Sequence, residues 1–156
     1  MKTPKLLFAA AAAALAGCAT VAPAPVPVVP VAAVSLTTAN KAPFGTYLVD
    51  GAGRALYILE GERMPGGTHR CIGPCLGVWP PLVSNVPPVA GAGVNAAQIG
   101  SMPMHGGLHV TYAGWPLYYY ARDRLPGDTV GQHVTDAWGT WHLISPSGVP
   151  IRPAGY

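Results

Sequence analysis

Residues 46–59 read TYLVDGAGRALYIL, and residues 108–120 read LHVTYAGWPLYYY. In each stretch, two short runs rich in β-branched and aromatic residues flank a turn that contains glycine, a pattern that predicts a β-hairpin. When Gly53 is placed on Gly114, the pair Leu56-Tyr57 falls on Leu117-Tyr118. The chain therefore contains two copies of the same predicted hairpin.

The correspondence continues downstream of the two hairpins. Trp79 lies 22 residues after Tyr57, and Trp141 lies 23 residues after Tyr118. We therefore predict a duplication, with repeats at about 44–82 and 108–146. Two copies are too few for a solenoid, so we expect an all-β, mainly antiparallel domain at 44–147 with pseudo-twofold symmetry.

The segments between these landmarks carry weaker signals. The 18 prolines and 20 glycines favour turns over long helices. We expect further strands at 132–135 and 140–145 and one short helical turn within 72–78. Residues 83–107, rich in Pro, Gly and Ala, are expected to connect the copies, and 148–156 to form a C-terminal tail.

The first 17 residues have the pattern of an export signal. Lys2 and Lys5 precede the apolar run 6–16, and Leu15-Ala16-Gly17 leads into Cys18. This resembles the lipobox of bacterial lipoproteins, which implies cleavage before Cys18, lipid on its sulfur and a membrane anchor. Eleven apolar residues span about 17 Å as a helix, too short for a hydrocarbon core of about 30 Å. The alternative is an ordinary secretory signal with an incidental cysteine.

Residues 18–43 are expected to form the lipidated start and a tether rich in Pro, Ala and Val. Prolines at 23, 25, 27 and 30 favour an extended polyproline II spacer. By the same resemblance, Ala19 is not the aspartate associated with inner-membrane retention. We therefore expect the protein in the cell envelope, with the outer membrane favoured.

Charge excludes one class of partner. Without Lys2 and Lys5, the mature chain keeps 7 of the 9 basic residues against 6 acidic ones, and the basic residues are scattered. Nucleic acid binding needs a clustered basic surface, so we expect no nucleic acid partner. We also expect no cofactor.

Cys71 and Cys75 are the pair that remains once Cys18 carries lipid. In an oxidising compartment, a structural disulfide is the favoured interpretation. The alternative is a redox or metal role, although the Cys-x3-Cys spacing differs from that of thioredoxin-like enzymes.

The best metal-ligand candidates are Met102, Met104 and His105, with His69 and His109 as further donors. Imidazole and thioether groups together suit copper. No helical or strand spacing fixes these donors, so the favoured interpretation is an exposed loop of unligated side chains.

A dense aromatic group is the candidate binding surface, and it comprises Trp115, Tyr118, Tyr119 and Tyr120, with Asp123 beside it. On a strand, Tyr118 and Tyr120 share one face and Tyr119 takes the other. One face could offer a platform for sugars, quinones or a partner protein. Core packing remains the favoured alternative, and Asp123 and Asp128 fit a polar turn in which carboxylates cap backbone donors.

These residues also carry a family resemblance. The run Tyr118 to Asp123 resembles the Yx(FWY)xxD signature of a family of predicted bacterial lipoproteins, described as a secreted repeat of unknown function. The first copy departs from the signature, with Leu59 at the aromatic position and Glu62 at the aspartate position. The resemblance implies location and architecture and no established activity, and if the signature forms a site, only the second copy keeps it.

The leading hypothesis for function is a non-enzymatic, membrane-anchored envelope lipoprotein whose domain binds a partner or has a structural role. The sequence contains no phosphate loop, no Gly-x-Ser-x-Gly elbow and no His-Glu-x-x-His helix. The alternative is a periplasmic copper-binding or thiol-redox protein, and a glycan-acting envelope enzyme is third.

Overall fold

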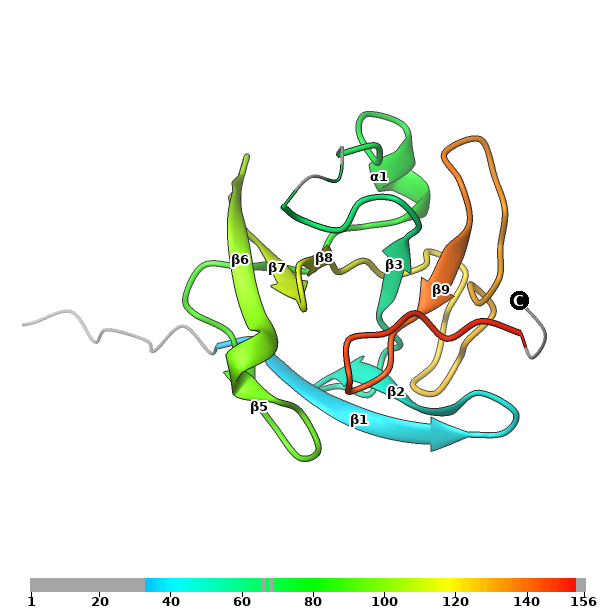
Figure 1. Cartoon of the computed structure of the whole chain (residues 1–156). Coiled ribbons are helices and arrows are strands. Elements are labelled where there is room, and N and C mark those ends of the chain that lie inside the picture. Colours follow the sequence, from blue (N-terminus) through cyan, green and yellow to red (C-terminus); the bar gives the residue numbers. More distant parts are fainter. Residues whose placement is uncertain (1–32, 66, 68, 154–156) are drawn as a thin grey trace, which may run out of the picture.

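Short strands dominate the part of the chain that the structure, a computed structural model, describes, namely residues 33–65, 67 and 69–153 (Figure 1). The strands are β1 (Ser35–Lys41), β2 (Gly45–Asp50), β3 (Tyr57–Leu59), β4 (Val83–Ser84), β5 (Val89–Ala90), β6 (Ile99–Met104), β7 (Gly107–Tyr112), β8 (Trp115–Pro116) and β9 (Trp141–Leu143). The predicted all-β class is confirmed. The predicted export signal, Cys18 and the proline-rich part of the tether lie outside the described residues.

Both predicted hairpins form at their turns. In the second copy, β7 pairs with β8, and the turn residues Ala113 and Gly114 have φ of 50° and 83°. Positive φ at both central positions matches the twist of the flanking strands. In the first copy, Val49 bridges Ala55 and Gly53 has φ of 80°. The glycines that align in sequence therefore occupy equivalent turn positions.

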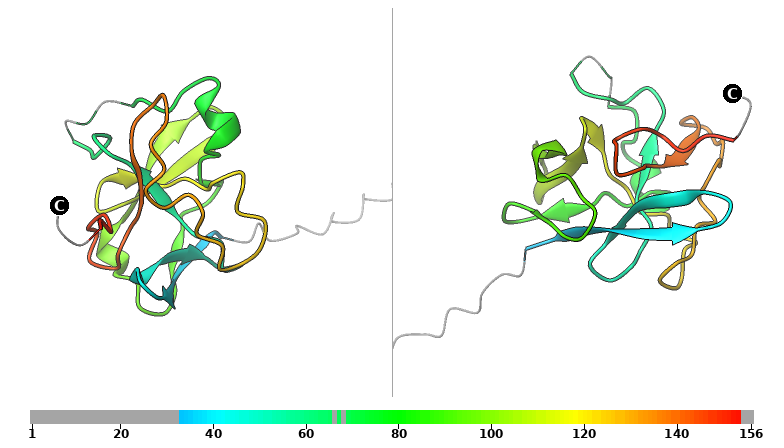
Figure 2. Two further views of the ribbon diagram at one scale, coloured as in Figure 1. Left: turned by 90° about the vertical axis from the view of Figure 1, so that its right-hand side faces the viewer. Right: turned by 60° about the horizontal axis from the view of Figure 1, so that its bottom comes forward.

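The two repeats exchange strands around a pseudo-twofold axis, and Figure 2 shows β9, in orange, beside β3. β9 of the second copy pairs with β3 of the first, and β4 of the first pairs with β7 of the second. At the centre, Tyr57 N–H donates to Tyr118 O at 2.8 Å, and Tyr118 N–H donates to Tyr57 O at 2.9 Å. The bond from Leu48 N–H to Ile144 O has its equivalent in the bond from Val110 N–H to Leu82 O. Each repeat therefore completes the sheet of the other.

Aromatic side chains fill the interior on this axis. Trp79 and Trp141, equivalent in the two copies, stack with ring centroids 3.9 Å apart and planes at 9°. Both indoles are fully buried, and both donate through Nε1 to the Asp136 carboxylate, at 2.8 Å and 3.1 Å. The tryptophan pair therefore joins the repeats in the core.

One helical turn, α1 (Cys75–Val78), lies within the predicted segment 72–78. Cys71 and Cys75 form a disulfide at its start, and both cysteines are fully buried. A second, 3-10 turn, η1 (Ala96–Gln98), precedes β6. Within the described residues, no helix has the length and apolar character needed to cross a membrane.

The predicted tether boundary at residue 43 is wrong. Residues 35–41 form β1, which pairs antiparallel with β2 from Leu36 opposite Asp50 to Lys41 opposite Gly45. This segment lies between Pro30 and Pro43, carries β-branched threonines and fully buries Leu36. The backbone of β2 needs a partner strand, and residues 35–41 supply it.

Three other segments differ from the predictions. Residues 83–107 are more than a connection, because they contain β6, which pairs with β7 along six residues. β6 is an edge strand, where Pro103 is tolerated. Residues 132–135 form only an isolated bridge from Thr135 to Thr140. The described part of the predicted tail, residues 148–153, is bound to the domain by the bond from Ile151 N–H to Leu143 O.

Candidate functional site

The acidic residues that align in the two copies accept hydrogen bonds across the pseudo-twofold axis. The Tyr57 hydroxyl donates to Asp123 Oδ2 at 2.7 Å, and the Tyr118 hydroxyl donates to Glu62 Oε2 at 3.0 Å. Each tyrosine therefore bonds to the carboxylate of the other repeat. The first copy departs from the signature, but its Glu62 accepts a hydrogen bond from a tyrosine of the other repeat, as Asp123 does in the second copy.

The two carboxylates differ in burial. Glu62 is fully buried, and its Oε1 also accepts from the backbone N–H of Cys71 at 2.8 Å. Asp123 is half-buried and accepts from Val130 N–H at 3.0 Å. Burial raises the pKa of the Asp123 carboxyl, against the hydrogen bonds from Tyr57 and Val130, which lower it. Both acids therefore organise loops, as carboxylates that accept backbone N–H groups do.

The predicted aromatic platform is not exposed. Trp115, Tyr118 and Tyr120 are buried, and their exposed fractions are 8%, 0% and 8%. Tyr119 is half-buried, and its hydroxyl donates to Asp50 Oδ2 at 2.9 Å while Arg54 lies 3.9 Å over the ring. The platform interpretation is therefore wrong for the tyrosine run, because both faces of this segment pack inside the domain.

The predicted metal donors are only partly brought together. His105 lies exposed at the turn between β6 and β7. Met102 lies opposite His109 across the β6–β7 pair, and the rings of His109 and His69 have centroids 5.8 Å apart. Among the described residues, no three side chains of His, Cys, Asp or Glu gather as a metal-ion group.

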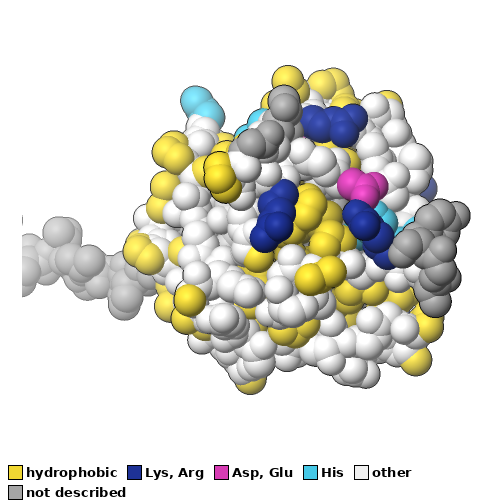
Figure 3. All heavy atoms as spheres, in the orientation of Figure 1, with side chains coloured by type: hydrophobic (Ala, Val, Ile, Leu, Met, Phe, Trp, Pro, Cys, Tyr) yellow, Lys and Arg dark blue, Asp and Glu magenta, His cyan; other side chains and the backbone are white. Residues whose placement is uncertain are grey.

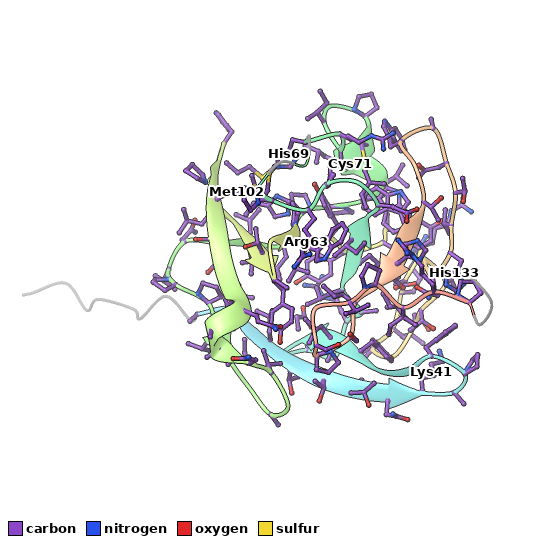
Figure 4. All side chains as sticks on the ribbon, viewed as in Figure 1. Lys41, Arg63, His69, Cys71, Met102 and His133 are labelled. Carbon is purple, nitrogen blue, oxygen red and sulfur yellow. A yellow bond between two sulfur atoms is a disulfide. The ribbon has the colours of Figure 1, made fainter. Side chains whose placement is uncertain are left out.

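A cavity of about 590 Å³ opens beside β9, on the other side of the domain. Its lining comes from three separate segments and comprises Glu60, His133, Thr135, Thr140, His142, Arg152 and Pro153. Figure 3 shows an acidic side chain against a basic one beside histidine atoms on this face, and Figure 4 places His133 next to β9. Its volume lies in the range typical of small-molecule sites.

His142 is the unusual residue of this cavity. Its side chain is only 5% exposed, and within the described part of the chain neither Nδ1 nor Nε2 has a hydrogen-bond partner. Burial lowers its pKa below the ordinary value, against the attraction of the Glu60 carboxylate, whose Oε2 lies 3.9 Å from Nε2. The ring is therefore neutral near pH 7, with one nitrogen that donates and one that accepts a hydrogen bond.

Polar side chains surround His142 in the cavity. The His133 ring lies edge-on to His142, with centroids 5.4 Å apart, and His133 itself has a φ of 61°. Left-handed backbone at a non-glycine residue costs about 1 to 3 kcal/mol and is frequent at functional sites. Glu60 forms an ion pair with Arg152, so their charges cancel.

The sequence did not identify this cavity as a candidate site, because no spacing links its three segments. The signal lies in the difference between the copies. Ile58 of the first copy corresponds to Tyr119 of the second. Ile58 pairs with His142, whereas the N–H of Tyr119 donates to Pro80 O. Pro80 therefore takes the position that corresponds to His142. The histidine thus departs from the repeat.

A family model described as a secreted repeat of unknown function matches residues 38–83 and 104–145, one range for each copy. These ranges cover more than half of the chain and coincide with the exchanged halves of the fold. No curated protein and no solved structure matches the chain.

Proposed function

The chain belongs to the Lipoprotein_15 family, described as a secreted repeat of unknown function, and on that premise we propose that it is a lipid-anchored binding module of the cell envelope. The module is not an enzyme. It is held by acyl groups on Cys18, with the outer membrane as its favoured destination. Its ligand is a small, neutral, hydroxyl-rich molecule, such as a sugar unit of an envelope glycan, which binds in the cavity beside β9.

The observation that carries the ligand class is the buried, neutral imidazole of His142 with both nitrogens unpartnered among the described residues. A buried polar group without a partner costs free energy, about 1 to 3 kcal/mol, which a bound ligand recovers. The paired Glu60 and Arg152 and the hydroxyls of Thr135 and Thr140, 3.1 Å apart, add donors and acceptors without net charge. Neutral hydroxyl groups, which both donate and accept, complement this lining.

The ligand proposal is tested by NMR titration of the protein in detergent with N-acetylglucosamine and the peptidoglycan disaccharide. The ring signals of His133 and His142 are expected to shift at millimolar sugar, while those of exposed His105 stay unchanged. The variant Arg152→Ala is expected to weaken the titration about tenfold. Unchanged His133 and His142 signals with both sugars would refute this ligand class.

The anchor is tested in cells with Cys18→Ala. Wild-type protein is expected in the membrane fraction, with an acylated amino-terminal Cys18 by mass spectrometry, because several acyl chains bind a bilayer firmly. The variant is expected to leave the membrane fraction. A wild-type protein with an intact Met1 and no acyl groups would contradict the anchor.

The non-enzymatic assignment has its own test. Purified protein is expected to leave envelope glycans intact, because Asp123 and Glu62 are occupied by tyrosine and backbone donors. Turnover of a glycan that is lost in Asp123→Ala would show an enzyme instead.

A further inference from the structure

Two histidines and a methionine converge at the edge of the β6–β7 hairpin, far from the cavity beside β9. Figure 4 shows His69 and Met102 on this side of the domain and His133 on the other. His109 lies near both, because its ring centroid is 5.8 Å from that of His69 and its strand position pairs with Met102. The donors come from three segments, so sequence spacing does not reveal the group.

His109 has the features of a metal-binding imidazole. It is fully buried, and its Nε2 lies 2.8 Å from Leu117 O. A carbonyl only accepts, so Nε2 carries the hydrogen and Nδ1 carries the free lone pair. That Nδ1 has no hydrogen-bond partner among the described residues. Histidines that bind metals commonly donate their other N–H to a carbonyl in this way.

Met102 supplies a soft donor on the same face as His109. Residues directly opposite each other in an antiparallel pair project to one side of the sheet, and Met102 is half-buried there. Met104, opposite Gly107, projects to the same side two residues further along β6. The thioether sulfur is a ligand that favours copper(I) over harder cations.

Glu62 supplies negative charge beneath this group. Its carboxylate is fully buried, and His69 Nδ1 lies 3.7 Å from Oε1. Within the described residues, no lysine or arginine comes within salt-bridge distance of it. A buried carboxylate without a basic partner is stabilised by a nearby cation.

We propose that His69, His109 and Met102 bind one copper(I) ion, with Glu62 balancing its charge. The imidazole centroids, 5.8 Å apart, leave room for an ion that forms bonds of about 2 Å to nitrogen. The equivalent of His109 in the first copy is Tyr47, which follows from the matching bonds of Leu48 and Val110. The site therefore exists in one half of the domain and is independent of the sugar cavity.

The test is a competition titration of the protein in detergent against a colorimetric copper(I) chelator. Ascorbate is the reductant, because it keeps copper as copper(I) and leaves the Cys71–Cys75 disulfide closed, which mass spectrometry checks. We expect one ion per chain with a Kd below micromolar. X-ray absorption is expected to show nitrogen and one sulfur around the ion.

Variants locate the ion. His69→Ala and Met102→Leu are expected to weaken binding about tenfold or more, and Met102→Leu to remove the sulfur signal. His105→Ala, an exposed histidine of the same hairpin, is the matched control and keeps full affinity. Each variant is checked for wild-type circular dichroism, so that loss of binding is not loss of fold.

The proposal is overturned by a copper(I) Kd weaker than micromolar, by full affinity in both His69→Ala and Met102→Leu, or by zinc binding at least as tight as copper(I). His109→Gln retains a donor toward Leu117 O and is the fourth variant. Full affinity in a folded His109→Gln protein would also exclude this site.

Discussion

Tyr57 and Tyr118 carry the interaction that joins the repeats at the residue scale. Their backbones bond to each other, and their hydroxyls reach the carboxylates of Asp123 and Glu62 in the opposite copies. The two hydroxyl–carboxylate hydrogen bonds have similar lengths. Their surroundings differ, since Glu62 is fully buried and Asp123 is half-buried. The loss of each hydroxyl should therefore have a different cost.

We predict that Tyr118→Phe lowers the free energy of unfolding by about 1 to 3 kcal/mol, because it leaves a buried carboxylate oxygen without its donor. Tyr57→Phe is the matched variant, and it should cost less, since water can reach Asp123. Urea denaturation of both variants measures the difference. An equal or larger cost for Tyr57→Phe would contradict the asymmetry.

A pH prediction concerns His142. Its pKa in the folded chain lies below the ordinary value of 6.5, so below that pH the unfolded chain takes up the proton more readily. The stability contributed by the neutral ring is full above about pH 6.5 and is lost as the pH falls through the folded pKa.

Denaturation at pH 7.5 and pH 5 checks this sign. The wild-type protein should lose more unfolding free energy between the two values than His142→Gln, which has no titrating ring. A variant that loses as much as the wild type would show that His142 is not held neutral by the fold.

At the scale of the element, turn chemistry explains what the sequence could predict. The hairpin at Ala113-Gly114 and the turn at Gly53 depend on a few adjacent residues, so local pattern identified them. β6 escaped prediction because Gly100 and Pro103 argue against a strand, and only pairing with β7 stabilises it. The segment of β1 was predicted to belong to the tether because its own residues do not show a strand pattern. It forms a strand because it pairs with β2.

For the candidate sites too, features set by residues close in sequence were predictable, and features set by tertiary pairing were not. The disulfide was predictable because Cys71 and Cys75 are close in sequence and pair in the structure. The aromatic run left two interpretations open, a binding surface and the favoured core packing, and the structure buries Trp115, Tyr118 and Tyr120. The cavity around His142 and the pairing of His109 with His69 depend on segments that only the tertiary fold brings together.

The disulfide element gives a further prediction. Cys71 and Cys75 are fully buried, so glutathione should not reach the sulfur atoms in the folded protein, as expected of a structural bridge. Thiol labelling should remain absent with glutathione alone and appear when denaturant is added. Labelling of the native protein would favour the redox interpretation.

The bridge closes a short loop, so it constrains the unfolded chain only modestly. We predict that Cys71→Ala with Cys75→Ala costs about 2 kcal/mol from loop entropy and keeps the fold. Thermal denaturation by circular dichroism measures the loss. An unfolded double variant would show that the bridge is required for folding rather than for local shape.

At the scale of the whole molecule, the exchanged strands and the stacked tryptophans make the two repeats one folding unit. β3 is paired by β9, and β7 is paired by β4, so neither copy contains its own complete sheet. These two pairings and the bridge from Tyr57 to Tyr118 cross between the repeats, which links their stability. The two functional proposals, the cavity and the copper site, occupy places where the copies differ on this shared frame.

Native-state hydrogen exchange of the Tyr57 and Tyr118 amides is the sharpest test of whether the two repeats unfold together. These amides bond to each other's carbonyls on the axis, so both should exchange only through global unfolding, with the same free energy and the same denaturant dependence. If one amide exchanged through a separate opening of its own repeat, with a lower free energy, the repeats would not be interlocked.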